Sequence, residues 1–403
     1  MPGVVAGAVG AARVVGHALV TAATIAAPAS ASDVLTCVRE AMEQRQPLRI
    51  VGCGQWLDGG RPVRATKQLS VGSLTGIVDY VPGDLTLTAL AGTTLAEIAR
   101  VTGAESQWLA LDPHGSADGS IGATIATASS GPLAHGLGLP RDVVLGLEVV
   151  TGAGAVVRAG GKVVKNVAGF DLTRLFTGSW GTLGVITEVT VRLRAVPDVD
   201  ETVVLDVDDR PEPLHVVLGR LRAGPVTPPA LELVNAALAA RLGIGERSSL
   251  LARFAGNAQD VRAQQAWLAQ LGGLRACPAS VWRALRECEP PRSMVFRLSA
   301  APARLADVWS AARAVCAAEP GTYMHATVGR GIVRCIVSPG SGAAQAAVVG
   351  AAASVDLPSV FERLPAQEWS AIGTGITHRL ARGVKQTFDP LGIMNPGILG
   401  ESA

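Results

Sequence analysis

The chain has 403 residues, with 35 basic and 33 acidic side chains and a formal net charge of +2. This length predicts about two domains. The balanced charge gives no long-range attraction to nucleic acid or to an anionic membrane surface, and no run of aromatic residues alternates with Lys and Arg, so we expect no nucleic-acid partner.

The N-terminal stretch 14–31 is apolar and ends in an Ala-Ser-Ala triplet, an ending that a signal peptide with a weak n-region would also show. We interpret residues 1–29 instead as an extension before the first domain element. Because His17 and Pro28 interrupt it, the stretch predicts no membrane-spanning helix. The six cysteines show no C-x-x-C, zinc or iron–sulfur spacing, which is typical of reduced thiols in a cytoplasmic protein.

Capping residues and apolar periodicity define the elements of the first half. Ser30 or Ser32 can cap a helix that begins near Asp33. Thr94 and Glu97 have the spacing of a capping box. The predicted elements are a helix from 33, strands at 48–51, 76–80 and 85–90, a helix from 95 to about 103, a hairpin of 143–150 with 155–158, a helix at 172–176 and a strand at 185–193.

From about residue 198 the pattern changes to short strands that alternate with helices. The predicted strands are 202–207, 250–254, 294–298 and 332–337, and the predicted helices are 260–271 and 305–317. This alternation predicts an α+β layer with helices on one side of an antiparallel sheet. The stretch 378–400 predicts a helix followed by an irregular segment.

Three glycine-rich segments of the first half, 52–56, 115–131 and 178–186, predict a binding site for a diphosphate. Glycine lets the backbone turn with positive φ and approach a ligand closely, so that successive N–H groups can point at phosphate oxygens. The segment 115–131 also carries six Ser and Thr hydroxyls, which can donate hydrogen bonds. A single glycine cluster would be interpreted as a turn, but three in one domain favour a site.

Other nucleotide-binding motifs do not fit the sequence. Gly52 and Gly54 lack the third glycine of a dinucleotide fingerprint, because Leu57 holds that place. The pair Gly152 and Gly154 lies between two predicted strands, where a hairpin turn is expected. The chain contains no G-x-x-x-x-G-K-[ST] run, so nucleotide hydrolysis has no support.

Four runs of the first half resemble the FAD-binding region of the vanillyl-alcohol-oxidase-like flavoproteins: 119–124, 140–146, 163–172 and 178–188. Within them, 165–171 (KNVAGFD) resembles the FAD-binding E subunit of glycolate oxidase in particular. The closing runs 388–390 (FDP) and 395–397 (NPG) are similar to the end of the superfamily's chains.

The resemblance implies FAD as the cofactor and assigns roles to the glycine-rich segments. Segments 52–56 and 115–131 would hold the pyrophosphate and ribityl chain, Val185 and Ile186 would lie against the adenine or the adjoining phosphates, and Asn395 would approach the flavin. The implied cofactor-binding residues are Gly52, Cys53, Gly54, Gln55, Trp56, Pro113, Gly115, Gly119, Ser120, Gly122, Ala123, Thr124, Thr127, Ser129, Gly131, Gly184, Val185, Ile186 and Asn395. Cys53 interrupts the three adjacent glycines that the family's first loop often has.

No residue is assigned to catalysis, but Lys165 and His325 are candidates. A cation near the flavin would favour its reduction, whereas an ordinary solvated lysine is the alternative for Lys165. Relatives that oxidise 2-hydroxy acids have paired histidines near His325, and here Thr327 stands where a second would be. We therefore interpret His325 as structural and expect no metal site. Some relatives attach flavin through histidine, but a hydrogen-bonding loop residue is the preferred interpretation of His114.

The expected fold is α+β: an N-terminal extension (1–29), a PCMH-type FAD-binding domain of two subdomains (30–197), an α+β cap or substrate domain (198–375) and a C-terminal segment that returns to the FAD domain (376–403). The expected function is FAD-dependent oxidation of glycolate or a related small 2-hydroxy acid. Electrons would pass to a second FAD subunit and an iron–sulfur subunit in the cytoplasm.

Two other functions remain open from the sequence. One is an FAD-binding assembly or electron-relay subunit that oxidises no substrate itself, which the absent second histidine favours. The other is a reductase of the cell-wall precursor type on the same FAD fold. That function would require NADPH, and no residue pattern of the chain indicates a nicotinamide site.

Overall fold

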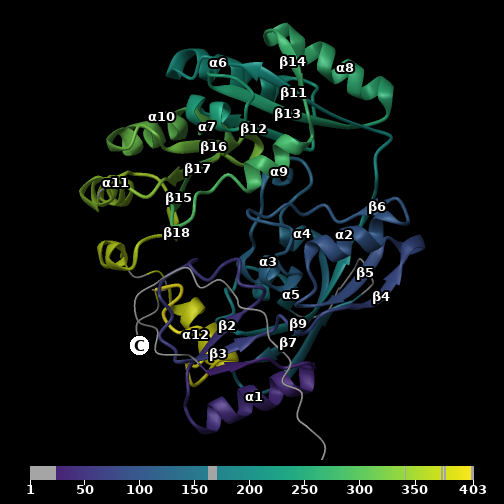
Figure 1. Cartoon of the computed structure of the whole chain (residues 1–403), viewed down its shortest axis with the longest axis vertical. Helices are drawn as coiled ribbons and strands as arrows, with labels where there is room; N and C mark the ends of the chain where they lie inside the picture. The colour runs from purple at the N-terminus through teal and green to yellow at the C-terminus, as the bar shows by residue number, and fades with distance from the viewer. Residues whose placement is uncertain (1–23, 162–169, 341, 374, 376–377, 401–403) are drawn as a thin grey trace, which may run out of the picture.

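The computed structural model describes residues 24–161, 170–340, 342–373, 375 and 378–400, and two large sheets dominate these ranges (Figure 1). One of these two large sheets lies in the first half of the chain and the other in the second half, and the irregular loops of the first half lie between them. In the described ranges no helix is both long and apolar enough to cross a membrane. All six cysteines fall in these ranges, and all are free thiols.

The described strands of the first half form a parallel sheet, a five-stranded antiparallel sheet and a small antiparallel sheet of β6 (Gln107–Trp108) and β10 (Arg194–Ala195). The parallel sheet has the order β1 (Thr24–Ala26), β3 (Lys67–Ser70), β2 (Leu48–Val51). The five-stranded sheet has the order β4 (Ile77–Val81), β5 (Thr86–Leu90), β9 (Gly184–Arg192), β7 (Val144–Thr151), β8 (Val156–Gly160). Strand β1 lies inside the stretch 1–29, where we expected no element, and its pairing with β3 ties it to the first half.

The helices of the first half begin at capping residues that the sequence marks. Helix α1 (Ala31–Glu43) starts where Ser30 accepts a hydrogen bond from the Asp33 N–H, and its apolar side packs into the core. Helix α2 (Leu95–Gly103) starts where Thr94 accepts from the Glu97 N–H, but the Glu97 carboxylate bonds to Arg100. Only one half of the predicted capping box forms. The shorter helices are α3 (Ile121–Thr127), α4 (Pro140–Val143) and α5 (Leu172–Phe176).

In the second half the described strands form one antiparallel sheet. Its order is β14 (Leu274–Cys277), β11 (Val199–Asp206), β13 (Ser249–Gly256), β12 (Ala230–Val234), β16 (Tyr323–Thr327), β17 (Ile332–Val337), β15 (Met294–Ser299), β18 (Ser359–Arg363). The sequence predicted β11, β13, β15 and β17. It did not predict their partners β12, β14, β16 and β18.

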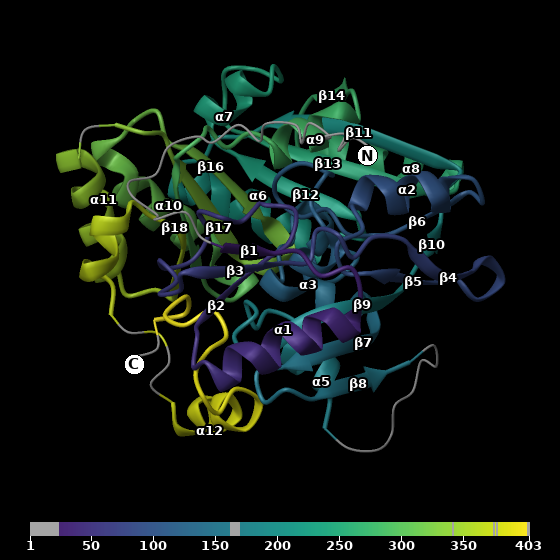
Figure 2. The same cartoon turned by 60° about the horizontal axis from the view of Figure 1, so that its bottom comes forward.

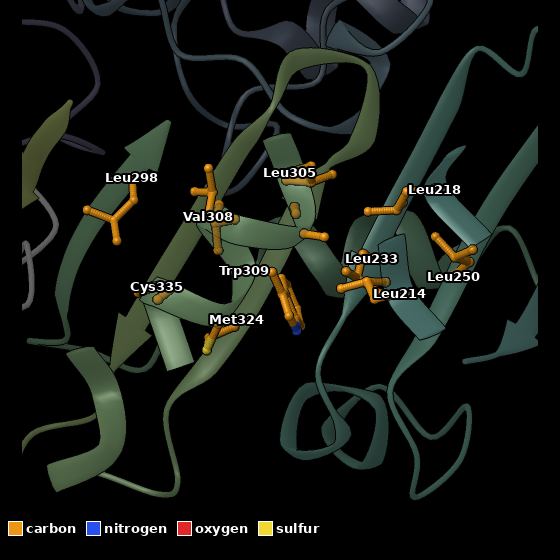
Figure 3. Packing of buried hydrophobic residues seen from close by; sticks show 14 of the residues in the cluster. Leu214, Leu218, Leu233, Leu250, Leu298, Leu305, Val308, Trp309, Met324 and Cys335 are labelled. Carbon is orange, nitrogen blue, oxygen red and sulfur yellow. The ribbon is translucent and has the colours of Figure 1, made fainter. Parts of the chain in front are cut away.

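One face of this sheet carries the larger helices, α6 (Pro211–Ala223), α8 (Ala258–Leu268), α10 (Leu305–Val315) and α11 (Gly342–Ser354). Trp309 of α10 is fully buried there among leucines such as Leu214 and Leu233 (Figure 3). The expectation that helices cover one side alone is wrong. Helices α7 (Ala236–Arg241) and α9 (Ser280–Arg286) pack on the other face, because β11 and β13 have apolar side chains on both sides.

The end of the chain returns to the first half: in Figure 2 the yellow segment that follows α12 (Arg379–Phe388) runs from that helix toward β2. The Leu48 N–H donates to the Ile393 carbonyl (2.8 Å), and the Asn395 N–H donates to the Leu48 carbonyl (3.0 Å). Ile393 and Met394 join the apolar core of the first half. These contacts support the domain limits 30–197, 198–375 and 376–403, which we propose.

Candidate functional site

A groove opens in the first half between the loop after β2, helix α3 and the loop that precedes β9. The Gly178 N–H donates to the Ile125 carbonyl (2.9 Å), and the Trp180 N–H donates to the Ala126 carbonyl (2.8 Å). The glycine-rich segments 115–131 and 178–186 therefore lie side by side. A shared site for one cofactor requires this adjacency.

About half of the residues predicted to bind FAD line this groove, and the structure explains two of the glycines among its walls. A Cβ on Gly52 would lie 2.5 Å from the Ser120 Oγ, and Gly54 has a φ of +86°. Gly52 lets the loop after β2 lie close to α3, and Gly54 lets the same loop turn. The predicted residues that line the groove are Gly52, Gly54, Gln55, Trp56, Gly122, Ala123, Thr127, Gly184, Ile186 and Asn395.

The other predicted cofactor residues do not line the groove. They are Cys53, Pro113, Gly115, Gly119, Ser120, Thr124, Ser129, Gly131 and Val185. Hydroxyls expected to serve as ligand donors are used within α3: Ser120 caps the helix, Thr124 donates to the Ser120 carbonyl (3.0 Å), and Thr127 donates to the Ala123 carbonyl (2.8 Å). Gly131 has a packing role, because a Cβ there would lie 2.2 Å from the Asp112 carbonyl oxygen. Lys165 lies outside the described residues.

Asn395 joins three segments at the floor of the groove. Its Oδ1 accepts from the Ile50 N–H (2.7 Å), and its Nδ2 donates to the Trp180 carbonyl (2.7 Å). The side chain is buried, and its backbone has a φ of +42°, a conformation that asparagine tolerates better than most residues. The closing NPG run thus fixes the loop that carries Trp180 to strand β2.

A second cavity adjoins the groove, and Trp56, Thr127 and Trp180 line both. The two indole rings meet edge to face, with centroids 5.8 Å apart. Beyond them the cavity reaches the face of the eight-stranded sheet on which α7 and α9 pack, at strands that these two helices do not cover. Ser129 and His114 also line this cavity rather than the groove.

A row of polar side chains crosses the sheet at the floor of this cavity. His325 on β16 is the cross-strand partner of Arg334 on β17, which is the partner of Arg297 on β15. Glu362 on β18 reaches both guanidinium groups, at 2.6 Å from Arg334 Nη2 and 2.7 Å from Arg297 Nε. Arg334 also pairs with Glu289. Cross-strand partners share one face of a sheet, so the row points into one cavity.

Burial and charge set the protonation of this row. Burial alone would lower the pKa of Arg334, but Glu362 and Glu289 outweigh it and raise that pKa. Burial would likewise raise the pKa of Glu362, but Arg334 and Arg297 lower it. Burial lowers the pKa of His114 well below its ordinary value, and the positive charge of Arg334 adds to this effect. His114 is therefore neutral at physiological pH.

Sequence reasoning missed most of this cavity, although a signal was present. Arg297, Arg334 and Glu232 each interrupt a run of apolar residues in a predicted or observed strand. A charged side chain at such a position is buried beside apolar neighbours, which is costly unless a partner or a ligand compensates the charge. We singled out His325 as a candidate but interpreted it as structural, because Thr327 stands where a second histidine would be. Its neighbours across the sheet are distant in sequence, so the sequence did not reveal them.

Arg330 closes the cavity at the end of β16, next to His135. Its Nε donates to the Ala134 carbonyl (2.6 Å), and among the described residues it has no carboxylate partner. The His135 Nδ1 accepts a hydrogen bond from the Gly329 N–H (2.9 Å). Burial, together with the charge of Arg330, lowers the pKa of His135 from 6.5 to about 4.

We expect this contact to make the fold acid-sensitive. Since the folded-state pKa of His135 lies below its unfolded value, the unfolded chain binds more protons, and stability is lost as the pH falls from 6.5 through about 4. The loss approaches about 3 kcal/mol. His135→Gln, which keeps an acceptor for the Gly329 N–H, should flatten this dependence in urea unfolding at several pH values. Parallel pH curves for both proteins would contradict the prediction.

Comparisons with known proteins support a cofactor site in the first half of the chain. A family model described as an FAD binding domain matches residues 22–160. The fold is similar to that of 4-ethylphenol oxidase from Gulosibacter chungangensis, with a TM-score of 0.70 and 16% identity over 93% of this chain and 88% of that one. An alkyldihydroxyacetonephosphate synthase gives a TM-score of 0.66 and 18% identity over 92% of this chain and 75% of its own. The chain is therefore an FAD-binding flavoprotein of α+β fold.

Sequence relatives narrow this class to a family. The chain is 33% identical to the glycolate oxidase subunit GlcE of Escherichia coli over 253 residues, which cover 62% of this chain and 71% of GlcE. It is 34% identical to the glycolate oxidase subunit GlcD of Bacillus subtilis over 179 residues, 44% of this chain but 38% of GlcD. The chain belongs to the GlcE family of FAD-linked oxidoreductases.

The groove fits FAD. Five glycines and two alanines among its lining residues let a ligand approach the backbone closely, and most of its other lining residues are apolar, which suits an aromatic ring system. The residues that would hold the cofactor are Gly52, Gly54, Gly122, Ala123, Gly184 and Asn395. Trp56 and Trp180 mark the end of the groove at which a flavin ring would face the second cavity.

Proposed function

We propose that this chain oxidises a small 2-hydroxy acid of the glycolate or D-lactate type, with FAD in the groove and the acid in the adjoining cavity. The observation that carries the proposal is the shared wall of Trp56, Thr127 and Trp180, which lets a ligand in one site reach a ligand in the other. Bound FAD supplies the hydride acceptor for such an oxidation. Two relatives' names support the substrate class: the glycolate oxidase subunit GlcE, and a probable D-lactate dehydrogenase of Danio rerio that is 34% identical over 42% of this chain and 35% of its own.

The charge of the cavity also supports a carboxylate substrate. Arg334 and Arg297 share Glu362, whereas Arg330 bonds to a backbone carbonyl and keeps its charge uncompensated by the described residues. A guanidinium in this state can bind a carboxylate with charge-assisted hydrogen bonds. The acid would then lie with its carboxylate toward Arg330 and its C2 toward the groove.

We also propose that the electrons pass to a second FAD subunit and an iron–sulfur subunit in a cytoplasmic complex. The names of GlcE and GlcD, each a subunit of glycolate oxidase, support this assembly. The test is an anaerobic titration of the FAD-loaded chain, alone and with its co-purified partners, using glycolate, D-lactate and, as the control without a hydroxyl, acetate.

The flavin absorbance should fall with a hydroxy acid and stay constant with acetate. A fall only in the presence of partners would place the oxidation in the complex. No fall in either preparation would refute the proposal and favour an assembly or electron-relay subunit.

Arg330→Gln should raise the dissociation constant of the hydroxy acid about 10- to 100-fold, because a hydrogen bond to a charged group contributes about 1.5–3 kcal/mol. The constant is obtained from the dependence of the flavin reduction rate on acid concentration. Arg304→Gln, which removes an exposed arginine paired with Asp307, is the matched control. Equal constants for R330Q and R304Q would exclude Arg330 from carboxylate binding.

A further inference from the structure

Two strands of the second half place a histidine against a buried carboxylate in the cavity. His325 on β16 and Glu232 on β12 lie on neighbouring strands, and the His325 Nδ1 is 2.7 Å from the Glu232 Oε2. The side chains are 3% and 0% exposed. A carboxylate can only accept a hydrogen bond, so the bond assigns the imidazole proton to Nδ1.

This assignment leaves the other ring nitrogen with a free lone pair. Among the described residues, the His325 Nε2 is buried and has no hydrogen-bond partner, and the Glu232 Oε1 is also without one. A pair that served only to join two strands would leave such atoms satisfied, since an unpaired buried polar atom costs about 1–3 kcal/mol. His325 lines the cavity, so the lone pair of its Nε2 is available to a ligand there.

His114 is the neighbour that could compete for the same role. Its ring centroid lies 5.5 Å from that of His325, and its buried Nδ1 has no partner in the described part of the chain. Its pKa is lowered by burial and by Arg334, which makes it a poor proton acceptor. Within the described ranges no carboxylate forms a hydrogen bond with His114, so its ring lacks the orientation that Glu232 gives to His325.

We propose that His325 is the catalytic base of the oxidation and that Glu232 is its positioning residue. This inference rests on the proposed function. The 2-hydroxy acid loses the hydroxyl proton to the His325 Nε2 and a hydride from C2 to FAD, and the C–O single bond becomes the carbonyl of the 2-oxo acid. The protonated imidazole is stabilised by the Glu232 carboxylate and returns its proton to water after product release.

The test compares His325→Asn, Glu232→Gln and Glu232→Ala in the FAD-loaded full chain. Loss of the base should lower the limiting rate constant of flavin reduction about 10²- to 10⁴-fold without raising the dissociation constant of the acid. E232Q should lower it about 10- to 100-fold, because the amide still orients the ring but carries no charge. His215→Asn, on the exposed side of α6, and Asp209→Asn, a carboxylate that accepts from Ser248 and Trp309, are the matched controls.

Two measurements, the pH dependence of the flavin reduction rate and the tautomer of His325, distinguish a catalytic role of His325 from a structural one. The wild-type rate should fall toward acid pH as one proton binds, and this fall should be absent in H325N. The charged and titratable groups around His325 are Glu232, His114, Arg334, Arg297, Arg330 and Glu362. Asp112, whose pKa burial raises to about 7, interacts with Glu232, so its own titration must be separated from that of His325 by its persistence in H325N. In ¹⁵N-histidine NMR, one of the six histidines should show an Nδ1–H tautomer that is lost in H325N and mixed in E232A. If E232A does not fold, E232Q carries the test.

Each outcome has a distinct meaning. Wild-type flavin that no hydroxy acid reduces, either in the chain alone or with its co-purified partners, would overturn the proposed function and this inference together. Reduction of wild type and H325N at equal rates would overturn the role of His325 alone. Loss of wild-type reduction on treatment with a chelator, restored by a divalent cation, would assign the hydroxyl to a metal and overturn the base as well.

Discussion

Arg334→Met is expected to lower the free energy of unfolding by about 3–5 kcal/mol, because it removes one partner of a buried ion-pair network. Arg334 is 2% exposed and pairs with Glu362 and Glu289. Without it both carboxylates, which are about 10% exposed, stay largely buried with less compensation. Arg297 and Arg363 still reach them, which places the expected loss toward the lower end of that range.

Urea unfolding of the FAD-free chain measures this loss. Arg100→Gln, which removes an exposed pair with Glu97, should change the free energy of unfolding by less than about 1 kcal/mol. Adding Glu362→Gln to R334M should recover part of the loss, since it removes a charge that the single variant leaves unpaired. An R334M chain as stable as wild type would show that the cavity hydrates these carboxylates and that the network is not buried in solution.

Gly181→Val is expected to weaken the binding of FAD in the groove. Gly181 has a φ of +66°, and a Cβ there would lie 2.7 Å from the Asn395 Nδ2. Valine in this conformation is strained by about 1–3 kcal/mol, and it displaces the side chain that joins Ile50 to Trp180. Because those segments form the groove, we expect the FAD dissociation constant to rise tenfold or more, with about 1.4 kcal/mol for each factor of ten.

The measurement is FAD titration into the FAD-free chain, followed by flavin fluorescence. Gly219→Ala on α6 is the control, because open space surrounds that glycine. Gly181→Ala should fall between wild type and valine. Unchanged affinity in G181V would mean that the floor of the groove does not contact the cofactor, and it would contradict the role we propose for Asn395.

Much of the first half was predictable because its signals are local, although strands β1 and β3 were not predicted. Ser30 and Thr94 cap the helices that they were expected to cap, and the glycine-rich loops lie together as one cofactor requires. The second half was less predictable. Strand β12 is a short apolar run, and β14 and β18 are edge strands with mixed exposure, so neither periodicity nor length separates them from loops.

The two parts of the candidate site differ in the same way: the groove was predictable from the sequence, and the cavity was not. The groove depends on glycine positions within short segments, which a single sequence displays. The cavity depends on cross-strand register: His325 faces Arg334, and Glu232 reaches His325 across 93 residues of sequence. Each of these residues can be recognised in the sequence as a polar position within an apolar strand. Which of them contact one another cannot be recognised, because strand register is set by tertiary pairing.

The bond between Asn395 and Trp180 spans 215 residues of sequence, and it sets an order of events during synthesis. The loops of the first half emerge from the ribosome early, but the groove lacks its floor until the return segment follows the whole second half. We therefore expect a nascent chain to bind FAD more weakly before that moment than after it. Cofactor loading would then follow the synthesis of the eight-stranded sheet.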